Sequence, residues 1–536
     1  MIKLKLIKKK KLKNIDLDNA EFQTLWKLMH ETNNPIFLTG KAGTGKSTFL
    51  KYITAKLRKK FVVLAPTGIA AVNVKGVTLH SFFKLPFRPI LPNDPEFQVK
   101  GGKIYEALKY SKEKQKLIQK TEIIIIDEIS MVRVDIIDAV DKILRAYCNR
   151  NLPFGGKQLL LVGDLFQLEP VVKSDQKRIL SQFYNSPYFF DALAFKHLNL
   201  IPVELKKVYR QDDNSFIQVL DNIRGGINLK EAIGVINSRM IDPDHFTEED
   251  YVIQLSTRRD SVDFTNQRRL GLLEGKEFEF KGKVEGEFNQ NNLPTDELLK
   301  LKLGSQVIFI KNDLEKRWYN GTIGKVIEID GKEITIELED GLILNIEEEK
   351  WSNIRYRYDN EQDKIIEDEV GSFIQYPIKL AWAITIHKSQ GLTFEKVYID
   401  MQGGAFAAGQ TYVALSRCRS LEGMTVKTPV AARDIIINDR VVQFMMNTNN
   451  KLLIDKELLR SQSAKELLSA YHSYQKELYT ESMINFMAVI LKQPDLFTPL
   501  VQRFIRILMV KIENKLAEKD EFIANLLDRV KKYIDD

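Results

Sequence analysis

The segment 40–48, GKAGTGKST, constrains the fold of this chain more than any other stretch of its sequence. It matches the pattern GxxxxGK[ST], and it lies between a short apolar run at 36–39 and an amphipathic run at 47–57. A buried strand, a glycine-rich loop and a helix in this order point backbone amides and the positive end of the helix dipole at one place. Because a phosphate group fits there, the segment predicts a phosphate loop in a parallel α/β sheet rather than a chance glycine turn.

The residue types of this loop predict a nucleoside triphosphate and a divalent cation as its ligands. The Lys46 ammonium would reach the β- and γ-phosphates, and the Ser47 hydroxyl would bind Mg²⁺. Gly43 and Gly45 let the backbone approach the anion without a Cβ in the way. We therefore predict that ATP is bound by the following residues: Gly40, Ala42, Gly43, Thr44, Gly45, Lys46, Ser47 and Thr48.

Two further predicted strands end in polar residues that suit the same site. The run 123–126 consists of four isoleucines and is followed by Asp127 and Glu128. Such a strand belongs in a buried parallel sheet, and ligands bind at the carboxyl ends of these strands. We expect Asp127 to hold Mg²⁺ through its water shell and Glu128 to polarise the attacking water. The stretch 159–170, LLLVGDLFQLEP, repeats the design and places Gln167 where it would contact the γ-phosphate or the water.

The remaining sequence predicts further domains. Apolar runs at 252–256 and 397–400, with helical stretches between them, indicate a second α/β sheet that forms the other wall of a nucleotide cleft. Alternating apolar residues and Asn-Gly or Asp-Gly turns predict a small antiparallel barrel, and a proline-rich stretch predicts a projecting insertion. The predicted domains are 1–205 with the insertion at 84–105, then 206–303 with 361–445, then the barrel at 304–360, and a helical domain at 446–536.

Composition adds weaker constraints. The chain of 536 residues has a formal net charge of +8, which agrees with a polyanionic partner but is more typical of a solvated surface. Its two cysteines, Cys148 and Cys418, form no disulfide or metal framework in the sequence, so a reducing interior is expected. No apolar run approaches the ~20 residues that span a bilayer. We expect no membrane partner, and a location at the cytoplasmic nucleoid of a bacterium or in the nucleus or mitochondria of a eukaryote.

Seven motifs in a fixed order make the chain similar to a known helicase family. They are FLTGKAGTGKST, APTGIAA with GVTLHSFF, IIIIDEISMV, LLVGDLFQLEPV, VYRQ, the AITIHKSQGLTF block and TYVALSRCRS, and they cover residues 20–425. The set resembles the superfamily 1B DNA helicases of the PIF (petite integration frequency) type, relatives of the RecD helicases. The resemblance implies an α/β fold with two RecA-like P-loop motor domains, a wedge in the first, an SH3-like β-barrel insertion in the second, and 5′ to 3′ unwinding. To these the helical pattern adds a C-terminal extension.

The resemblance also implies roles for single residues. Gln23 resembles the glutamine that pairs with the adenine edge. Arg210 in VYRQ and Arg417 in ALSRCRS resemble two arginines that reach the γ-phosphate from the second domain and complete the catalytic set with Lys46, Glu128 and Gln167. Contacts to nucleic-acid phosphates, which are salt-dependent and blind to base sequence, are implied for Thr67, His80, Thr385, His387, Lys388 and Ser389.

These predictions together describe an ATP- and Mg²⁺-dependent DNA helicase that acts as a monomer. It would move along single-stranded DNA and unwind duplex, forked or quadruplex DNA in replication, repair, recombination or telomere maintenance. Two alternatives stay open. The same motor could translocate without unwinding DNA or act on RNA, or the chain could be a nucleotide-switched binding module with vestigial hydrolysis. The full set of predicted catalytic residues argues against the switch.

Overall fold

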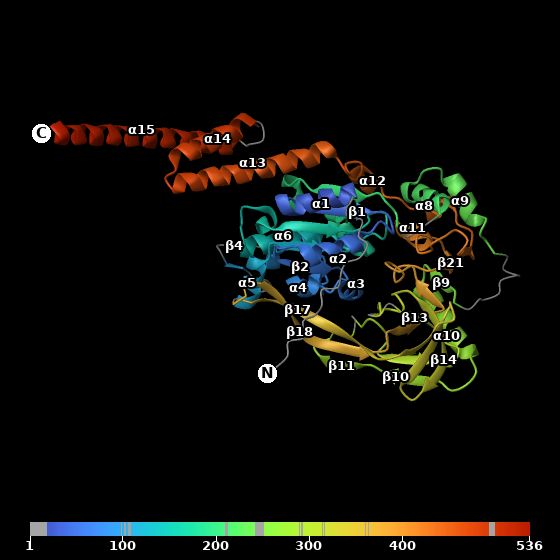
Figure 1. Ribbon diagram of the computed structural model, residues 1–536. Coiled ribbons are helices and arrows are strands. Elements are labelled where there is room, and N and C mark those ends of the chain that lie inside the picture. Colours follow the sequence, from blue (N-terminus) through green and yellow to red (C-terminus); the bar gives the residue numbers. More distant parts are fainter. Residues whose placement is uncertain are drawn as a thin grey trace, which may run out of the picture. The chain divides into compact units, whose positions relative to one another are not determined.

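The computed structural model contains two parallel sheets, which lie in one unit together with an antiparallel region (Figure 1). The structure describes residues 19–535 except 98, 101–102, 105–108, 210–212, 242–250, 289, 291–292, 314, 316, 360, 363 and 493–498. Of the described residues, 19–25 and 34–449 form this first unit, and 26–33 with 450–535 form a second.

The first sheet is parallel throughout and carries the phosphate loop. Its strand order is β3-β2-β6-β7-β1-β8. Every residue of the central strands β1, β6 and β7 is buried, as their apolar sequences predict for a sheet covered on both faces. The strands are β1 (Ile36–Gly40), β2 (Phe61–Ala65), β3 (Val77–Thr78), β6 (Ile123–Ile126), β7 (Gln158–Val162) and β8 (Ile201–Leu205).

Helices pack around this sheet through apolar faces. Phe22 and Phe49, on the first two helices, have ring centroids 5.2 Å apart, whereas Ile136, Ile137 and Val140 of α6 are buried in the main core of this domain. The α-helices are α1 (Ala20–Glu31), α2 (Lys46–Lys56), α3 (Gly68–Asn73), α4 (Leu79–Phe83), α5 (Lys112–Lys120), α6 (Val134–Tyr147) and α7 (Ser174–Leu180). Short 3-10 helices lie at Pro95–Phe97, Ile129–Met131, Pro153–Gly156, Phe189–Asp191 and Leu193–His197.

The second parallel sheet confirms the predicted second α/β region. Its order is β20-β9-β21-β22, and Leu255, Ile399 and Val413 lie in its core. Its strands are β9 (Ile253–Ser256), β20 (Ala383–Thr385), β21 (Val397–Asp400) and β22 (Met424–Val426). The helices of this part of the chain are α8 (Asn214–Gly225), α9 (Leu229–Asn237), α10 (Arg259–Leu272), α11 (Gln410–Leu415), the 3-10 helix Ala432–Asp434 and α12 (Asp439–Met445). The last of them returns to the first domain, because Val441 and Met445 are buried in the core of the first sheet.

A five-stranded antiparallel sheet follows the alternation seen in the sequence. Its order is β16-β15-β14-β13-β19, and Gly331, with a φ of 58°, turns the chain between β14 and β15 as the Asp-Gly pair predicts. The region extends beyond 304–360, because Phe280, Leu299 and Tyr376 pack into its core. The five strands of the sheet are β13 (Gln306–Phe309), β14 (Ile323–Asp330), β15 (Glu333–Leu338), β16 (Ile343–Ile346) and β19 (Ile378–Leu380). Strands β10 (Phe278–Lys281) and β12 (Leu298–Leu301) form a separate antiparallel pair.

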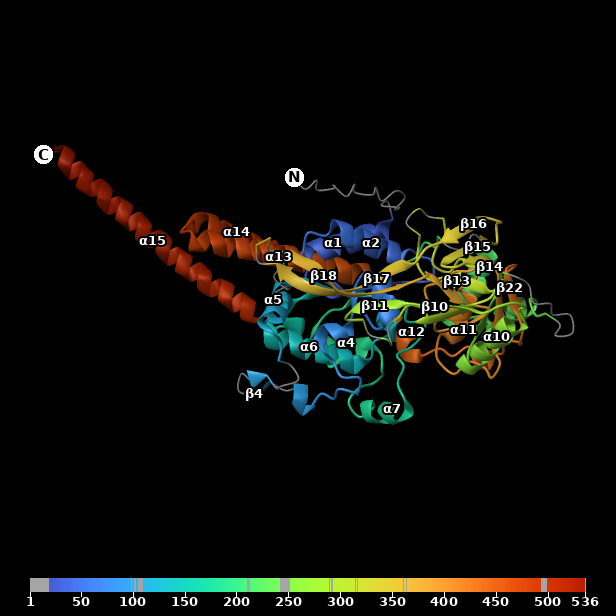
Figure 2. The same ribbon diagram turned by 90° about the horizontal axis from the view of Figure 1, so that it is seen from below.

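A long hairpin connects this antiparallel region to the first domain, which the sequence analysis did not predict. It consists of β17 (Glu349–Asp359) and β18 (Lys364–Gln375), with β11 (Lys283–Gly286) alongside. Figures 1 and 2 show the hairpin reaching the neighbourhood of α5. There Tyr356 is buried in the first core, and its hydroxyl accepts from the amide of Val63 at 3.3 Å.

The proline-rich insertion is anchored more firmly than its composition suggests. We expected 84–105 to project from the domain, yet Leu85, Ile90 and Phe97 are buried in the first core. Beyond them β4 (Val99–Lys100) and β5 (Lys103–Ile104) form a short antiparallel pair. Prolines prevent long regular elements here, but they do not prevent apolar side chains from packing.

The second unit is helical, in agreement with the pattern after residue 450. It contains α13 (Lys451–Gln475), α14 (Tyr479–Lys492) and α15 (Pro499–Asp535), which share a core that includes Ala470, Phe486 and Ile505. The unit also takes in residues 26–33, which include the second half of α1, and there the carbonyl of Glu31 accepts from the Ser461 hydroxyl. The predicted domain boundary placed residues 26–33 with the first sheet, because only tertiary packing separates the two halves of α1.

Across the described part of the chain, no helix is both long and apolar enough to cross a membrane. Both cysteines are free thiols.

Candidate nucleotide site and nucleic-acid contacts

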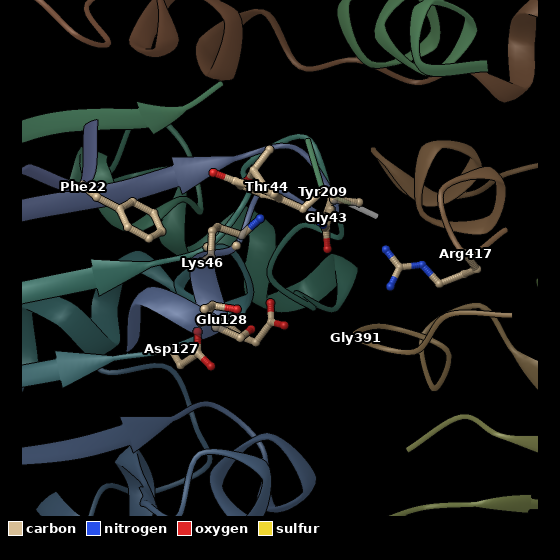
Figure 3. Close-up of a pocket in the computed structure, with 15 residues that line it drawn as sticks. Phe22, Gly43, Thr44, Lys46, Asp127, Glu128, Tyr209, Gly391 and Arg417 are labelled. Atoms are coloured by element: carbon tan, nitrogen blue, oxygen red, sulfur yellow. The ribbon is translucent and has the colours of Figure 1, made fainter. Parts of the chain in front are cut away.

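A cavity of about 370 Å³ lies at the carboxyl ends of β1, β6 and β7 and is closed from the other side by residues of the second α/β domain (Figure 3). Ligands occupy this edge in parallel α/β sheets. Most of the predicted nucleotide-site residues are brought together here. The cavity is lined by Phe22, Ala42, Gly43, Thr44, Gly45, Lys46, Ser47, Thr48, Asp127, Glu128, Gly163, Gln167, Tyr209, Gly391 and Arg417.

The phosphate loop has the backbone that its glycines predict. Gly45, with a φ of 92°, stands directly before α2. Gly40 does not line the cavity, but a Cβ there would lie 2.5 Å from Thr44 Oγ1, so its role is to let the loop close. Lys46 Nζ donates to the carbonyl oxygens of Gly40 at 2.6 Å and Lys41 at 3.1 Å. The ammonium is therefore held inside the curve of the loop, where phosphate oxygens would bind.

Two adjacent carboxylates face the cavity from the end of β6. Burial, followed by repulsion from Glu128, raises the pKa of Asp127 to about 7. Burial also raises the pKa of Glu128, whereas Lys46 and Arg417 oppose that shift. Two buried acids side by side are ionised more easily when a positive charge lies close to them.

The predicted Mg²⁺ ion would supply such a positive charge beside Asp127 and Glu128. Among the described residues, no cluster of three or more His, Cys, Asp or Glu side chains could enclose a metal ion alone. Mg²⁺, however, is commonly bound by one or two carboxylates together with water and substrate phosphates. Ser47 and Asp127 line the same cavity, so the donor set matches an ion that arrives with a nucleotide.

The second domain contributes two polar side chains to the cavity. Figure 3 shows Arg417 extending into it from the side opposite Lys46 and the carboxylates. The guanidinium is buried and is held by the carbonyl oxygens of Val413 at 2.9 Å and Leu392 at 3.2 Å. Gln390 was not singled out from the sequence, yet its Nε2 donates to Glu128 Oε2 at 2.9 Å. The only feature of the sequence that could have identified Gln390 is its position inside the IHKSQG motif.

Two aromatic rings flank the phosphate loop where the adenine glutamine was predicted. Phe22 and Tyr209 line the cavity on either side of Gly45. Gln23 is exposed and is not among the lining residues, so the structure does not bring it to the site. Apolar rings suit the faces of a base better than its polar edge. The predicted arginine Arg210 lies outside the described residues; its neighbour Tyr209 donates its amide to the Gly43 carbonyl at 2.9 Å.

The predicted nucleic-acid residues of the first domain follow strands β2 and β3. Thr67 is exposed and caps α3 by accepting from the Ala70 amide at 3.3 Å. His80 stacks on the exposed ring of Phe87, with centroids 4.9 Å apart and planes within 8°. Burial and then Arg133 lower the pKa of His80, so the imidazole is neutral at pH 7. The His80 and Phe87 rings could therefore stack on a nucleic-acid base, and the neutral imidazole could also form a hydrogen bond with the nucleic acid.

In the second domain the predicted residues lie at the end of β20 and directly after it. Lys388 is exposed, and its pKa is lowered by Lys379 first, which indicates a concentration of positive charge. His387 stacks near Phe406, and burial lowers its pKa. Thr385 accepts from the Lys388 amide at 3.3 Å. Ser389 is fully buried and donates to the Ile386 carbonyl at 2.8 Å, so its hydroxyl faces no ligand in this conformation.

A phosphate loop, an acidic pair at the end of another strand of the same sheet and an arginine from a second parallel sheet define a two-domain P-loop nucleotide-binding fold. Residues 19–232 match the family model of PIF1-like helicases. The chain is 31% identical to "ATP-dependent DNA helicase Pif1" of Bdellovibrio bacteriovorus over 76% of this chain and 87% of that protein. The chain therefore belongs to the PIF1-like helicase family.

Other relatives agree. "ATP-dependent DNA helicase PIF1" of Homo sapiens is 34% identical over 76% of this chain but only 60% of the human protein, so the chain spans well under the full length of that relative. The crystal structure of Bacteroides sp. Pif1 in complex with ADP-AlF4 superposes with a TM-score of 0.74 at 39% identity, covering 81% of this chain and 97% of that one. Bacteroides Pif1 bound to single-stranded DNA gives a TM-score of 0.57 at 40% identity with the same coverage.

Proposed function

We propose that this chain is an ATP-dependent DNA helicase that moves 5′ to 3′ along single-stranded DNA and unwinds duplex DNA ahead of it. One observation carries the proposal: the nucleotide cavity is shared between two parallel-sheet domains, with Lys46 and Glu128 on one wall and Arg417 on the other. A nucleotide bound there would bridge the two domains, so hydrolysis would change their separation. This is the basic requirement of a translocating motor.

The residues of the cavity would supply the groups needed for attack of water on the γ-phosphate. Glu128 would accept the proton of the attacking water, and Gln167 would orient that water. Lys46 and Arg417 would stabilise the negative charge that develops on the transferring phosphoryl group. We propose Arg210 as a second arginine in this role. Mg²⁺, held by Ser47 and Asp127, would neutralise charge on the β- and γ-phosphate oxygens.

We propose that the smaller parts of the chain adapt this motor to unwinding. The antiparallel region around β13 to β16 would be an SH3-like barrel, and residues 84–105 would form the wedge that separates the strands. The helical unit after residue 450 would be an appended extension. Because base-pair stacking averages ~1.4 kcal/mol per step, one nucleotide hydrolysed per step supplies enough free energy.

Single-stranded and forked DNA are the partners that we propose. The relatives support this, because Bacteroides Pif1 has been solved with single-stranded DNA, and a related structure concerns forked duplex DNA and two coordinating helicases. The present structure superposes on the unliganded Bacteroides protein with a TM-score of 0.72 and on its DNA complex with 0.57, at the same 40% identity. Quadruplex substrates, a monomeric state, roles in genome maintenance and a nucleoid, nuclear or mitochondrial location complete the proposal.

The decisive experiment combines ATP hydrolysis with directional unwinding. Steady-state hydrolysis would be measured with and without single-stranded DNA or RNA, alongside unwinding of duplexes that carry either a 5′ or a 3′ tail. Glu128→Gln serves as the inactive control. We expect strong stimulation by DNA and opening of only the 5′-tailed duplex.

Each other outcome selects a different function. Stimulation without unwinding would indicate a translocase, and preferential stimulation by RNA would indicate an RNA helicase. Hydrolysis that ignores nucleic acid altogether would contradict the helicase proposal and favour a nucleotide-controlled binding module.

A further inference from the structure

Arg224, at the last turn of α8, forms a buried ion-pair cluster with the first domain that no catalytic role yet explains. Its Nη2 lies 3.2 Å from Asp164 Oδ1 and 3.0 Å from Glu204 Oε1. Its side chain is 10% exposed, and its guanidinium carbon lies 4.3 Å from the ring centroid of Phe166. Arg224 itself is on a helix whose apolar residues pack in the second core, so the cluster joins two domains.

The cluster continues to the catalytic carboxylate through a chain of hydrogen bonds. Asp164 accepts from Gln167 Nε2 through its other oxygen, Oδ2, at 3.3 Å. The opposite end of the same amide, Gln167 Oε1, accepts from Gln390 Nε2 at 3.4 Å. Gln390 Nε2 also donates to Glu128 Oε2 at 2.9 Å. Three side chains, those of Asp164, Gln167 and Gln390, thus connect Arg224 to Glu128.

The charge of Arg224 determines how the Gln167 amide faces. Asp164 accepts hydrogen bonds but donates none when ionised, so it draws the NH₂ end of Gln167 and leaves the carbonyl end toward the cavity. The Arg224 guanidinium, 3.2 Å away, holds that carboxylate in position. Without this partner, a buried Asp164 would lose its main counter-ion, and neither the position nor the orientation of the Gln167 amide would be fixed.

A purely structural role is the alternative explanation. Buried ion pairs often add little net stability, because desolvation offsets their attraction. A pair that spans two domains has a further property: it forms only while the domains are together. The pair therefore makes the geometry of Gln167 depend on the distance between domains.

We propose that Arg224 is a positioning residue that couples the approach of the two domains to hydrolysis, by orienting Gln167 through Asp164. This inference rests on the proposed ATP hydrolysis, and it names a residue that would regulate that step without contacting the nucleotide.

A double-mutant cycle in the full-length chain tests the coupling. The variants are Arg224→Gln, Gln167→Ala and the double variant, and the measurements are kcat and KM for ATP, with fluorescent-nucleotide binding and thermal melting as folding checks. We expect Arg224→Gln to lower kcat on the order of tenfold with KM nearly unchanged. In the Gln167→Ala background the same change should have almost no further effect on kcat, because the group it acts through is gone.

Two matched variants keep the test decisive. Glu204→Gln removes the other carboxylate partner of Arg224 but leaves Asp164 in place, and it should hydrolyse ATP at nearly the wild-type rate. Arg224→Lys, which keeps the charge but not the fork of donors, should show a smaller loss with the same dependence on Gln167, and it replaces Arg224→Gln if that variant does not fold.

Several results would overturn the proposal. The first is a wild-type kcat in the Arg224 variants, and the second is a double variant in which the two losses of kcat multiply. The third is a loss of kcat in Glu204→Gln as large as that in Arg224→Gln, which would indicate that the ion pairs only hold the two domains together. An inactive wild-type protein would instead remove the proposed function and this inference with it.

Discussion

At the scale of residues, the orientation of Asp127 and Glu128 toward the cavity depends on a break in regular structure directly after β6. Side chains alternate between the two faces of a strand, so Asp127 and Glu128 could not both face the cavity if the strand continued. Glu128 has a φ of 49° and a ψ of 43°, a left-handed conformation that costs a non-glycine residue about 1–2 kcal/mol. This turn brings both carboxylates to the cavity, which is the kind of strain that functional sites retain.

Lys46 gives the first residue-level prediction. Lys46→Ala removes the ammonium from the phosphate loop, and we expect kcat for ATP hydrolysis to fall by about 100-fold or more, the usual cost of losing a group that stabilises the transition state. Lys51→Ala, on the exposed face of the same helix, is the control and should behave as wild type. Circular dichroism should show both variants folded. Undiminished hydrolysis by Lys46→Ala would exclude this loop as the catalytic site.

At the scale of elements, the docking of the β17–β18 hairpin is the feature with the clearest electrostatic signature. Lys114 of α5 lies with its Nζ 3.3 Å from the ring centroid of Phe82. Burial lowers the pKa of Lys114 to about 7, and repulsion from Lys84 and from Arg355 of β17 adds to the effect. The charged form is therefore disfavoured where the hairpin meets the first domain.

This shift predicts a pH dependence with a definite sign. The pKa of Lys114 is 10.5 in the unfolded chain and about 7 in the folded one, so between these values the unfolded state binds more protons. Stability of the first domain should consequently rise with pH across this window. We expect Lys114→Met to raise the melting temperature at pH 7 and to reduce its rise between pH 7 and 10, while Lys116→Met, on the exposed face of α5, does neither. A lower melting temperature for Lys114→Met would mean that the attraction of the ammonium to the Phe82 ring outweighs its burial.

For the whole molecule, one close approach between the two α/β domains is at the backbone of Gly409. A Cβ at this position would lie 2.3 Å from the Gln167 carbonyl oxygen and 2.4 Å from that of Phe166. Ala42 of the phosphate loop also contacts the second domain, because its amide donates to the Tyr412 hydroxyl at 3.2 Å. The domains therefore touch directly beside the catalytic residues.

Gly409→Ala should hold the two domains apart. We expect ATP hydrolysis to fall at least about tenfold, because displacements of an ångström at an active site have costs of this size. Binding of ATP to the phosphate loop should change little, since that loop belongs to the first domain. Gly275→Ala is the matched control: Gly275 also has a positive φ, 93°, but nothing lies within 4 Å of an added Cβ. Equal losses in both variants would attribute the effect to backbone strain and not to domain separation.

Much of this architecture could be predicted because it is local in the sequence. The isoleucine run at 123–126 and the apolar run before Gly40 became the strands they predict, and the polar residues at their ends line one cavity. The contributions of Phe22 and Gln390 were missed, because a helix face and a loop far along the chain carry no local mark of what they meet. For the same reason the sequence did not show that Gln23 lies outside the cavity lining or that Ser389 is buried. A motif gives a position in the chain but not the direction of a side chain.

The sequence by itself determined the strands that carry the nucleotide site, the polar residues at their ends and the family. Periodicity, glycine-rich turns and contiguous motifs are properties of short segments. Only the tertiary structure decided what happens between segments. It placed Arg224 against Asp164, bridged Glu128 and Gln167 with Gln390, and packed Tyr356 of the hairpin into the first core. Such contacts depend on distances between residues up to hundreds of positions apart, and these distances are fixed by packing of the whole chain.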